Sequence, residues 1–261
     1  MTAVTMPDAE QIAAFRRDGA IVLRGAFGEW VEPLRAGVAR NMAEPSADVR
    51  IYHGKDGSGL FFGDYANWSR IPEYRAFVFG SPAAAIAARL MGSRTARLFH
   101  EHVLVKEPGT DVPTPWHHDL PYYCIEGRQN VSMWLALDPV PAETTVEFIA
   151  GSHDWGRRFR PERFNRTALY DDDGLEPVPD IDANRSNFTI LSWPLEPGDC
   201  VAFHFLTLHG APGNRSAATR SVSSSAASAS ARSFRSPTSV SSASRSEPTS
   251  PSAASISSTR P

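Results

Sequence analysis

Hydrophobic and polar positions divide the chain into a helical first part and a strand-rich second part. Apolar residues recur at helical spacing over residues 8–18, where Asp8 and Gln11 can form a capping box and Gly19 can end the helix. The same kinds of pattern predict the other elements of this part, which are a strand at residues 20–24 and helices at residues 30–42 and 81–91.

Short alternating strands replace the helices from about residue 95 onward. Over residues 97–106, His100, His102, Leu104 and Lys106 share one face of a strand. Further strands, separated by Pro- and Gly-containing turns, are predicted at residues 130–138, 145–149, 189–193 and 199–209. This pattern favours a mainly β fold with flanking helices, of the jelly-roll or cupin-like kind.

Two stretches without periodicity, residues 45–68 and 155–187, are predicted to be long loops. The second contains the acidic run at residues 171–173, which is most simply a solvated turn. Loops of this length often cover binding sites, so substrate contacts are expected in these two places.

Composition changes abruptly after about residue 216, where Ser and Ala dominate and large apolar residues become rare. Such a stretch cannot bury enough surface to offset the entropy lost on ordering it. The sequence therefore predicts a folded domain over residues 1–220 and a disordered tail over residues 221–261.

Charge and cysteine content narrow the classes of partner. A net charge of −3 without basic clusters gives no indication of a nucleic-acid or membrane partner, which leaves a small-molecule substrate as the expectation. Cys124 and Cys200 are too few for a disulfide framework or a thiolate metal site, and no apolar run resembles a leader or a membrane span. We expect a cytoplasmic protein; no motif indicates its oligomeric state.

The densest group of metal-binding side chains is the run His117-His118-Asp119, which lies among aromatic residues. In an extended strand His117 and Asp119 share a face and His118 points away. A histidine and a carboxylate make up two-thirds of the facial triad of a non-haem Fe(II) site, which needs one more histidine and leaves positions open for a cosubstrate and O₂.

Two later histidines compete for the third position. His204 lies mid-strand between two phenylalanines, whereas His209 lies at a strand end beside a glycine, and this favours His209. Each is followed at the same distance by an arginine, Arg215 or Arg220, so spacing alone does not decide. A guanidinium near the metal would suit a cosubstrate carboxylate.

Other polar and aromatic residues of this region have simpler interpretations. His153 is expected to order a turn by hydrogen bonding, and His118 to lie behind the ligands or on the surface. His102 could line the site or be a satisfied core histidine, and Tyr122 and Tyr123 could contact substrate or pack the mouth of a barrel.

The runs WHHDLPYY, MWLALDPV, EFIAGSHDWG and LEPGDCVAFHFLTLHGAPGNRSAATR resemble the phytanoyl-CoA dioxygenase family of Fe(II)- and 2-oxoglutarate-dependent oxygenases. The resemblance extends over residues 8–220. It implies a double-stranded β-helix in which His117, Asp119 and His209 bind iron and Arg220 pairs with the distal carboxylate of 2-oxoglutarate. It also implies that Trp134 and His102 line the cosubstrate site.

The resemblance further implies a reaction in which O₂ and 2-oxoglutarate are consumed, succinate is formed and a small organic substrate is hydroxylated. Halogenating relatives lack the metal-binding carboxylate, so Asp119 favours hydroxylation. Two alternatives remain open: an inactive metal-binding descendant that serves as a binding module, and a cupin-like metal-dependent lyase or isomerase.

The chain departs from the family after Arg220, where the family continues with a further hydrophobic stretch. Here the sequence reads SVSSSAASASARSF. An Ala-, Arg- and Ser-rich run is what a GC-rich gene gives out of frame, and our hypothesis is that the reading frame slipped at about Ser221. The resemblance then indicates the family origin of the chain more directly than its enzymatic activity.

Overall fold

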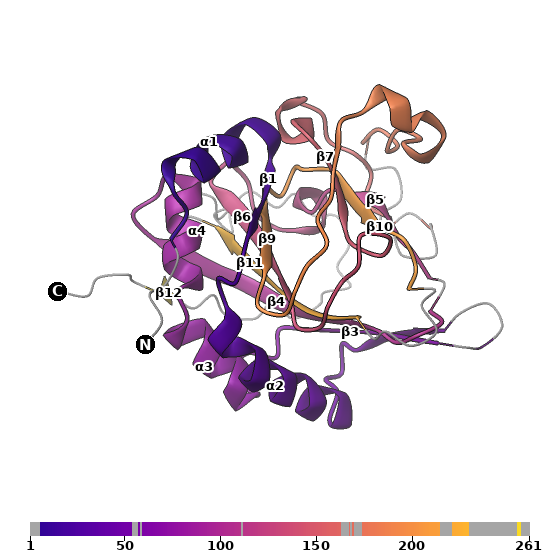
Figure 1. Cartoon of the computed structure of the whole chain (residues 1–261). Coiled ribbons are helices and arrows are strands. Elements are labelled where there is room, and N and C mark those ends of the chain that lie inside the picture. The colour runs from indigo at the N-terminus through magenta and orange to yellow at the C-terminus, as the bar shows by residue number, and fades with distance from the viewer. Residues whose placement is uncertain are drawn as a thin grey trace.

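The computed structural model describes residues 6–53, 57, 59–110, 112–162, 167, 169 and 174–214, together with the backbone of residues 221–229 and 255–256. Two antiparallel sheets pack against each other, and the helices lie together on the outer side of the larger sheet (Figure 1). The expected fold class, mainly β with flanking helices, is confirmed.

Three helices lie where the sequence predicted them, namely α1 (Ala9–Asp18), α2 (Val31–Ala43) and α4 (Ala83–Met91). The capping box of α1 is formed, and Gly19 ends this helix with φ 80° in the left-handed region. Helix α3 (Pro72–Gly80) was not predicted. Its aromatic and β-branched residues are weak helix formers, and burial of Tyr74 and Phe77 stabilises the helix instead.

The larger sheet has the strand order β1 (Ala20–Leu23), β9 (Cys200–Phe203), β6 (Asn130–Ala136), β11 (Ser221–Ala229), β4 (Ala96–Lys106), β3 (Leu60–Tyr65), β2 (Arg50–His53), and β12 (Ser255–Ile256) also pairs with β4. The smaller sheet has the order β5 (Thr114–His117), β10 (His209–Ala211), β7 (Glu147–Ile149), β8 (Ile190–Leu191). Short 3₁₀ turns complete the described elements: η1 (Gly28–Trp30), η2 (Leu120–Tyr122), η3 (Ser152–Asp154) and η4 (Asp182–Asn187).

Alternation along the strands of the larger sheet separates two cores. On β6, Met133 and Leu135 pack on the helices, whereas Trp134 and Ala136 face the smaller sheet. Between the sheets, the rings of Phe148 and Phe203 lie 5.1 Å apart. Burying a phenylalanine side chain contributes roughly 2 to 3 kcal/mol to the free energy of folding. The apolar side chains between the two sheets therefore form a stable packed core.

Residues 45–68 are not one long loop, and this prediction was wrong. They contain the hairpin of β2 and β3, and β3 pairs with β4. Gly63 and Asp64, which look like loop residues, have other roles. A Cβ on Gly63 would lie 3.1 Å from Nε2 of His102, and Asp64 is fully buried. The described part of residues 155–187 contains η4 and the bridge between Phe159 and Glu176, and the acidic run at 171–173 lies outside the described residues.

Residues 221–229 depart from the expected disorder, because their backbone forms β11 between β4 and β6. Backbone hydrogen bonds do not depend on side-chain size, so a Ser- and Ala-rich segment can occupy a central strand position. The domain boundary at residue 220 stays a prediction. Residues 230–254 and 257–261 lie outside the described residues.

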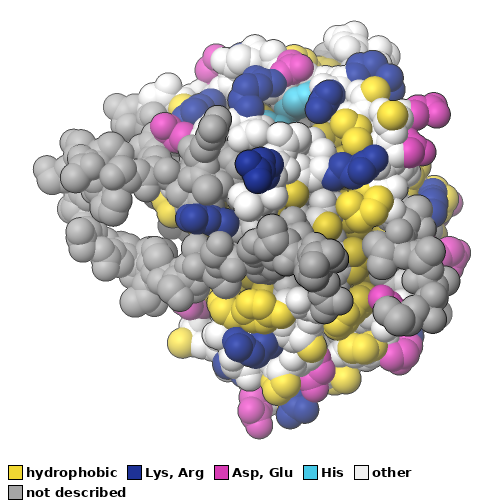
Figure 2. Space-filling model, turned by 90° about the vertical axis from the view of Figure 1, so that its left-hand side faces the viewer, with side chains coloured by type: hydrophobic (Ala, Val, Ile, Leu, Met, Phe, Trp, Pro, Cys, Tyr) yellow, Lys and Arg dark blue, Asp and Glu magenta, His cyan; other side chains and the backbone are white. Residues whose placement is uncertain are grey.

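On the helix-covered side of the molecule, Lys and Arg side chains lie interspersed with Asp and Glu (Figure 2). Across the described part of the chain, every helix is too short or too polar to cross a membrane.

Candidate metal centre

Pairing of β5 with β10 brings two distant histidines together. His209, the first residue of β10, lies directly opposite His117, the last residue of β5, and their ring centroids are 4.2 Å apart. Asp119 follows two residues later, where the chain has left the strand and turns into η2 with φ −70° and ψ −34°. The turn, and not the strand alternation that we assumed, therefore carries the carboxylate to the same face as His117.

The three side chains converge on one point. Oδ1 of Asp119 lies 3.7 Å from Nε2 of His117 and 3.7 Å from Nε2 of His209. One ligand atom from each residue falls within 4.8 Å of the others, and this is the one such group in the described part of the chain. Asp119 and His209 are buried whereas His117 is partly exposed, so the centre opens on the His117 side.

Backbone carbonyls fix the orientation of both imidazoles. Nδ1 of His117 lies 2.8 Å from the Pro115 carbonyl oxygen, and Nδ1 of His209 lies 2.9 Å from that of Thr207. A carbonyl only accepts, so Nδ1 carries the proton and Nε2 presents its lone pair toward Asp119. Ser132 donates to Oδ2 of Asp119 at 2.7 Å, which leaves Oδ1 as the second ligand atom.

The charge balance of the centre fits a bound cation. Burial lowers the pKa of His209 well below its ordinary value, so this imidazole is neutral at pH 7. Burial raises the pKa of Asp119, and no Lys or Arg of the described residues lies within 4 Å of it. A buried carboxylate beside a neutral imidazole is costly, and a divalent metal ion would offset that cost. Two imidazoles and one carboxylate form the donor set of a facial Fe(II) triad.

The competing histidines are engaged elsewhere. Nε2 of His204 lies 3.0 Å from the Arg128 carbonyl, and its Nδ1 accepts from the Leu206 amide at 3.1 Å. His118 is buried, with Nε2 accepting from the Phe159 amide at 3.0 Å, so it lies behind the ligands. His153 donates to the Arg16 carbonyl and links η3 to α1.

The residues expected around a cosubstrate are only partly described. Trp134 and His102 lie on the inner face of the larger sheet, His102 stacked on Tyr65 with ring centroids 3.8 Å apart. Arg220 lies outside the described residues. The roles of Trp134, His102 and Arg220 beside a cosubstrate stay predictions.

Lys106 is a cation that the sequence interpretation left without a role. It shares the face of β4 with His102, and Nζ lies 3.2 Å from both Thr114 Oγ1 and the Pro212 carbonyl. It has no carboxylate within 4 Å among the described residues, and burial lowers its pKa to about 8. The alternation of residues 97–106 had placed Lys106 on the same strand face as His102, and this feature of the sequence could have indicated a role for the lysine near the site.

Comparison with known proteins decides the family. The model of the phytanoyl-CoA dioxygenase family matches residues 15–222, which is most of the chain. The chain belongs to the phytanoyl-CoA dioxygenase family. The resemblance noted in the sequence is thereby confirmed. No curated protein matches the chain.

Solved structures of this fold include enzymes of several reaction types. The epimerase SnoN of nogalamycin biosynthesis, in complex with Fe3+, alpha ketoglutarate and nogalamycin RO, is 25% identical with TM-score 0.68, covering 88% of this chain and 86% of that one. The carbocyclase SnoK of the same biosynthesis is 21% identical with TM-score 0.67, covering 86% and 85%. EctD from S. alaskensis, with 2-oxoglutarate and 5-hydroxyectoine, is 21% identical with TM-score 0.68, covering 87% and 77%; the last two likenesses show the fold alone.

Proposed function

We propose that this member of the phytanoyl-CoA dioxygenase family is an Fe(II)- and 2-oxoglutarate-dependent oxygenase that hydroxylates a small organic substrate. The observation that carries the proposal is the convergence of His117, Asp119 and His209 in a geometry that leaves both Nε2 lone pairs and Oδ1 directed at one point. Iron bound there would supply the activation of O₂, coupled to decarboxylation of 2-oxoglutarate to succinate.

The chain's own residues would hold and orient the reactants. His117, Asp119 and His209 would bind the metal, and Ser132 would keep Asp119 in place through its hydrogen bond. The open side at His117 would admit cosubstrate and O₂, and the packed rings of Phe148 and Phe203 beside His209 would keep bulk water away from its buried side.

Two cations are candidates for the distal carboxylate of 2-oxoglutarate. Arg220 is proposed from the family resemblance, with Trp134 and His102 as neighbours of the cosubstrate. Lys106 is proposed from its contacts, because a half-buried ammonium on the same face of β4 as His102, without a carboxylate partner among the described residues, is suited to an incoming one. The cytoplasmic location stays a prediction.

Anaerobic titration with Fe(II) and 2-oxoglutarate tests the site. The expected result is a visible charge-transfer band, followed by succinate formation when O₂ is admitted. His117→Ala should abolish the band. His118→Gln is the matched control, because glutamine can still accept from the Phe159 amide and does not face the metal. Folded protein without a band would contradict the proposal.

The reaction type is tested on the organic product. Hydroxylation adds one oxygen atom, whereas an epimerase such as SnoN returns a product of unchanged composition; the likeness to SnoN makes epimerisation the second candidate. A band without succinate would favour the inactive binding module, and turnover without O₂ would favour a lyase or isomerase.

We also propose that residues 1–220 are the oxygenase domain and that residues 221–261 derive from a slipped reading frame. The family match ends at residue 222, close to the place where Ser and Ala take over. Translating both alternative frames of the gene from residue 221 should give an apolar, strand-like continuation. If neither frame does so, the tail is genuine.

A further inference from the structure

Three aromatic side chains with polar ends gather beside the metal centre. Tyr65 comes from β3, His100 from β4 and Tyr123 from the turn after η2. The ring of His100 lies 4.9 Å from that of Tyr123 and 6.2 Å from that of Tyr65. Three segments that are distant in sequence thus supply one group of rings on the inner face of the larger sheet.

The polar ends of these rings make no hydrogen bond to the described residues. Among the described residues, neither tyrosine hydroxyl and neither ring nitrogen of His100 has a hydrogen-bond partner, and all three residues are only partly buried. Tyr122 differs, because its hydroxyl donates to the Glu162 carbonyl at 2.7 Å. Three unpaired, reachable polar groups on one wall make a surface that a ligand can satisfy.

These side chains are uncharged at neutral pH. Burial lowers the pKa of His100 to about 4, and burial raises the pKa of both Tyr65 and Tyr123 above its ordinary value. Tyr122, the residue before Tyr123, has its ring centroid 5.7 Å from that of His117, which places the group close to the metal centre. A charged part of a ligand would lose its hydration here without gaining a counter-charge.

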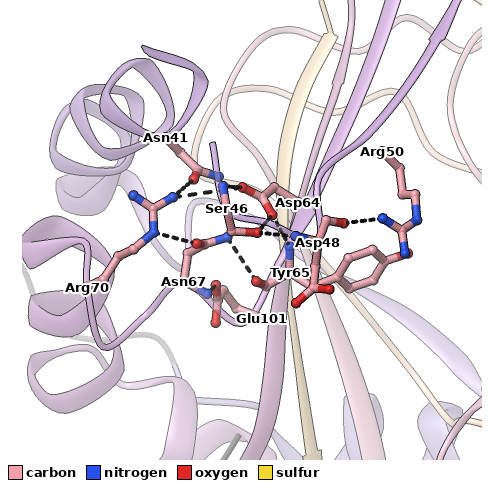
Figure 3. Close-up of polar contacts among 9 residues, drawn as sticks. All are labelled: Asn41, Ser46, Asp48, Arg50, Asp64, Tyr65, Asn67, Arg70 and Glu101. Atoms are coloured by element: carbon pink, nitrogen blue, oxygen red, sulfur yellow. Dashed lines mark hydrogen bonds and ion pairs between the residues drawn. The ribbon is translucent and has the colours of Figure 1, made fainter. Parts of the chain in front are cut away.

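The backbone around Tyr65 is held from behind the sheet (Figure 3). Asp64 accepts from the Tyr65 amide and Asn67 donates to the Tyr65 carbonyl, each at 2.9 Å. Ala66, in the left-handed region at φ 57°, donates to the Glu101 carbonyl at 2.9 Å. A left-handed residue costs about 1 kcal/mol or more, and these contacts maintain it, so Tyr65 has a fixed position.

One cation lies near the edge of this group. Arg50, in β2, is exposed and donates to the backbone carbonyls of Asp48 and Val49, and the ring of Tyr65 extends toward it (Figure 3). Its carbonyl contacts hold it at the solvent edge and not among the three rings. Lys106 is one of the two cations proposed for the cosubstrate carboxylate.

We propose that Tyr65, His100 and Tyr123 form the substrate-recognition surface of the site, and that this surface takes a neutral ring bearing hydroxyl or carbonyl groups. Ring faces offer stacking or C–H contacts, and the three free polar ends offer hydrogen bonds. The inference rests on the proposed function only in calling the ligand a substrate. Such a ring could belong to an aromatic alcohol or to a sugar.

Binding to the metal-free full chain tests the inference independently of turnover. Calorimetry is carried out with two matched pairs of probes: 2-naphthol with 2-naphthoate, and methyl β-glucoside with glucose 6-phosphate. We expect one neutral probe to bind and its charged partner to bind about tenfold or more weakly. The pair that responds identifies the aromatic or the sugar source.

Removal of single hydroxyls locates the site. Tyr65→Phe and Tyr123→Phe keep the rings and should each weaken binding about threefold to tenfold, the net value of one neutral hydrogen bond. Tyr74→Phe is the matched control and should leave binding unchanged, because the Tyr74 hydroxyl is buried on the helix side of the larger sheet without a partner among the described residues. Failure of both neutral probes to bind, equal binding of a charged partner, or an equal loss in the control would overturn the inference. Absence of the Fe(II) and 2-oxoglutarate band would instead count against the proposed function.

Discussion

Two buried aspartates on opposite sides of the larger sheet differ in what surrounds them. Asp64 is fully buried and accepts from the amides of Ser46 and Tyr65 at 2.9 Å and from the Ser46 hydroxyl. The guanidinium of Arg70 lies 3.9 Å away and is itself bonded to Asn41 and Asn67 (Figure 3). The protein thus supplies a full set of donors to this carboxylate.

Asp119 has one hydroxyl donor at Oδ2, and two imidazoles are directed at Oδ1. Buried carboxylates that stabilise a fold are saturated by the protein, whereas one that is left with lone pairs and an open side is available to a ligand. These surroundings distinguish a structural carboxylate, Asp64, from a ligand-binding one, Asp119. We therefore expect Asp→Asn substitutions at the two positions to have opposite effects on stability and on metal binding.

The largest effect is expected for Asp119→Asn. Removing the carboxylate charge should weaken Fe(II) binding by about 100-fold or more and abolish succinate formation, since one of three ligands loses its charge. The metal-free protein should be equally or more stable, because an unpaired buried charge has gone. Equilibrium Fe(II) binding and chemical denaturation measure both. If the metal-free Asp119→Asn variant were less stable than the unaltered protein, Asp119 would be a structural carboxylate like Asp64, and the account would be wrong.

Asp64→Asn is expected to give the reverse result. It leaves Arg70 without its carboxylate and turns an acceptor into a donor facing amide groups, which should lower the free energy of unfolding by about 3 kcal/mol. Fe(II) binding at a temperature where the variant is folded should persist. Asp48→Asn is the control, because Asp48 is exposed, and it should change stability by less than about 0.5 kcal/mol. An unchanged unfolding midpoint for Asp64→Asn would contradict this account.

A third buried carboxylate, Glu101, lies between these extremes. It accepts from the Asn67 amide through Oε1, while Oε2 has no hydrogen-bond partner among the described residues, and burial raises its pKa to about 7. The folded state therefore keeps a proton that the unfolded state releases at lower pH. Stability should fall as pH rises from about 5 to about 7, with a slope approaching about 1.4 kcal/mol per pH unit.

Glu101→Gln removes the titrating group and should flatten this part of the pH profile of stability. Denaturation at several pH values compares the two proteins. If the slope is the same in the variant, Glu101 is not the group that links stability to pH.

The smallest effect is expected at Lys106. Lys106→Met should raise the 2-oxoglutarate concentration needed for half of the charge-transfer band by about tenfold, because one charge-assisted contact is lost. Fe(II) binding alone should not change, since Lys106 is not a metal ligand. Lys106→Arg should recover part of the loss. Equal affinity for 2-oxoglutarate in Lys106→Met would leave Arg220 as the remaining candidate.

The sequence could predict the elements that repeat or that carry a motif. Strand β4 follows from strict alternation, and the meeting of His117, Asp119 and His209 follows from the family resemblance. The backbone conformation at Asp119 could not be foreseen. Strand β5 ends at His117, so Asp119 lies in the following turn and not in a continued strand. A two-residue separation is compatible with either a strand or a turn.

The hairpin of β2 and β3 was missed for a physical reason. Gly63 and Asp64 are loop residues by propensity, and only their neighbours explain them: His102 approaches Gly63, and Ser46 and Arg70 satisfy Asp64. Those neighbours are distant in sequence and form no motif. The recognition surface of Tyr65, His100 and Tyr123 depends on the same pairing and was invisible for the same reason.

The central claim is that His209, and not His204, completes the metal site with His117 and Asp119. Equilibrium binding of Fe(II) under anaerobic conditions to His209→Ala and to His204→Gln tests it most directly, with folding of each variant verified by circular dichroism. We expect one Fe(II) per chain for the unaltered protein and for His204→Gln, and binding weakened by about 100-fold or more for His209→Ala. Retained binding in folded His209→Ala, or its loss in folded His204→Gln, would contradict the account.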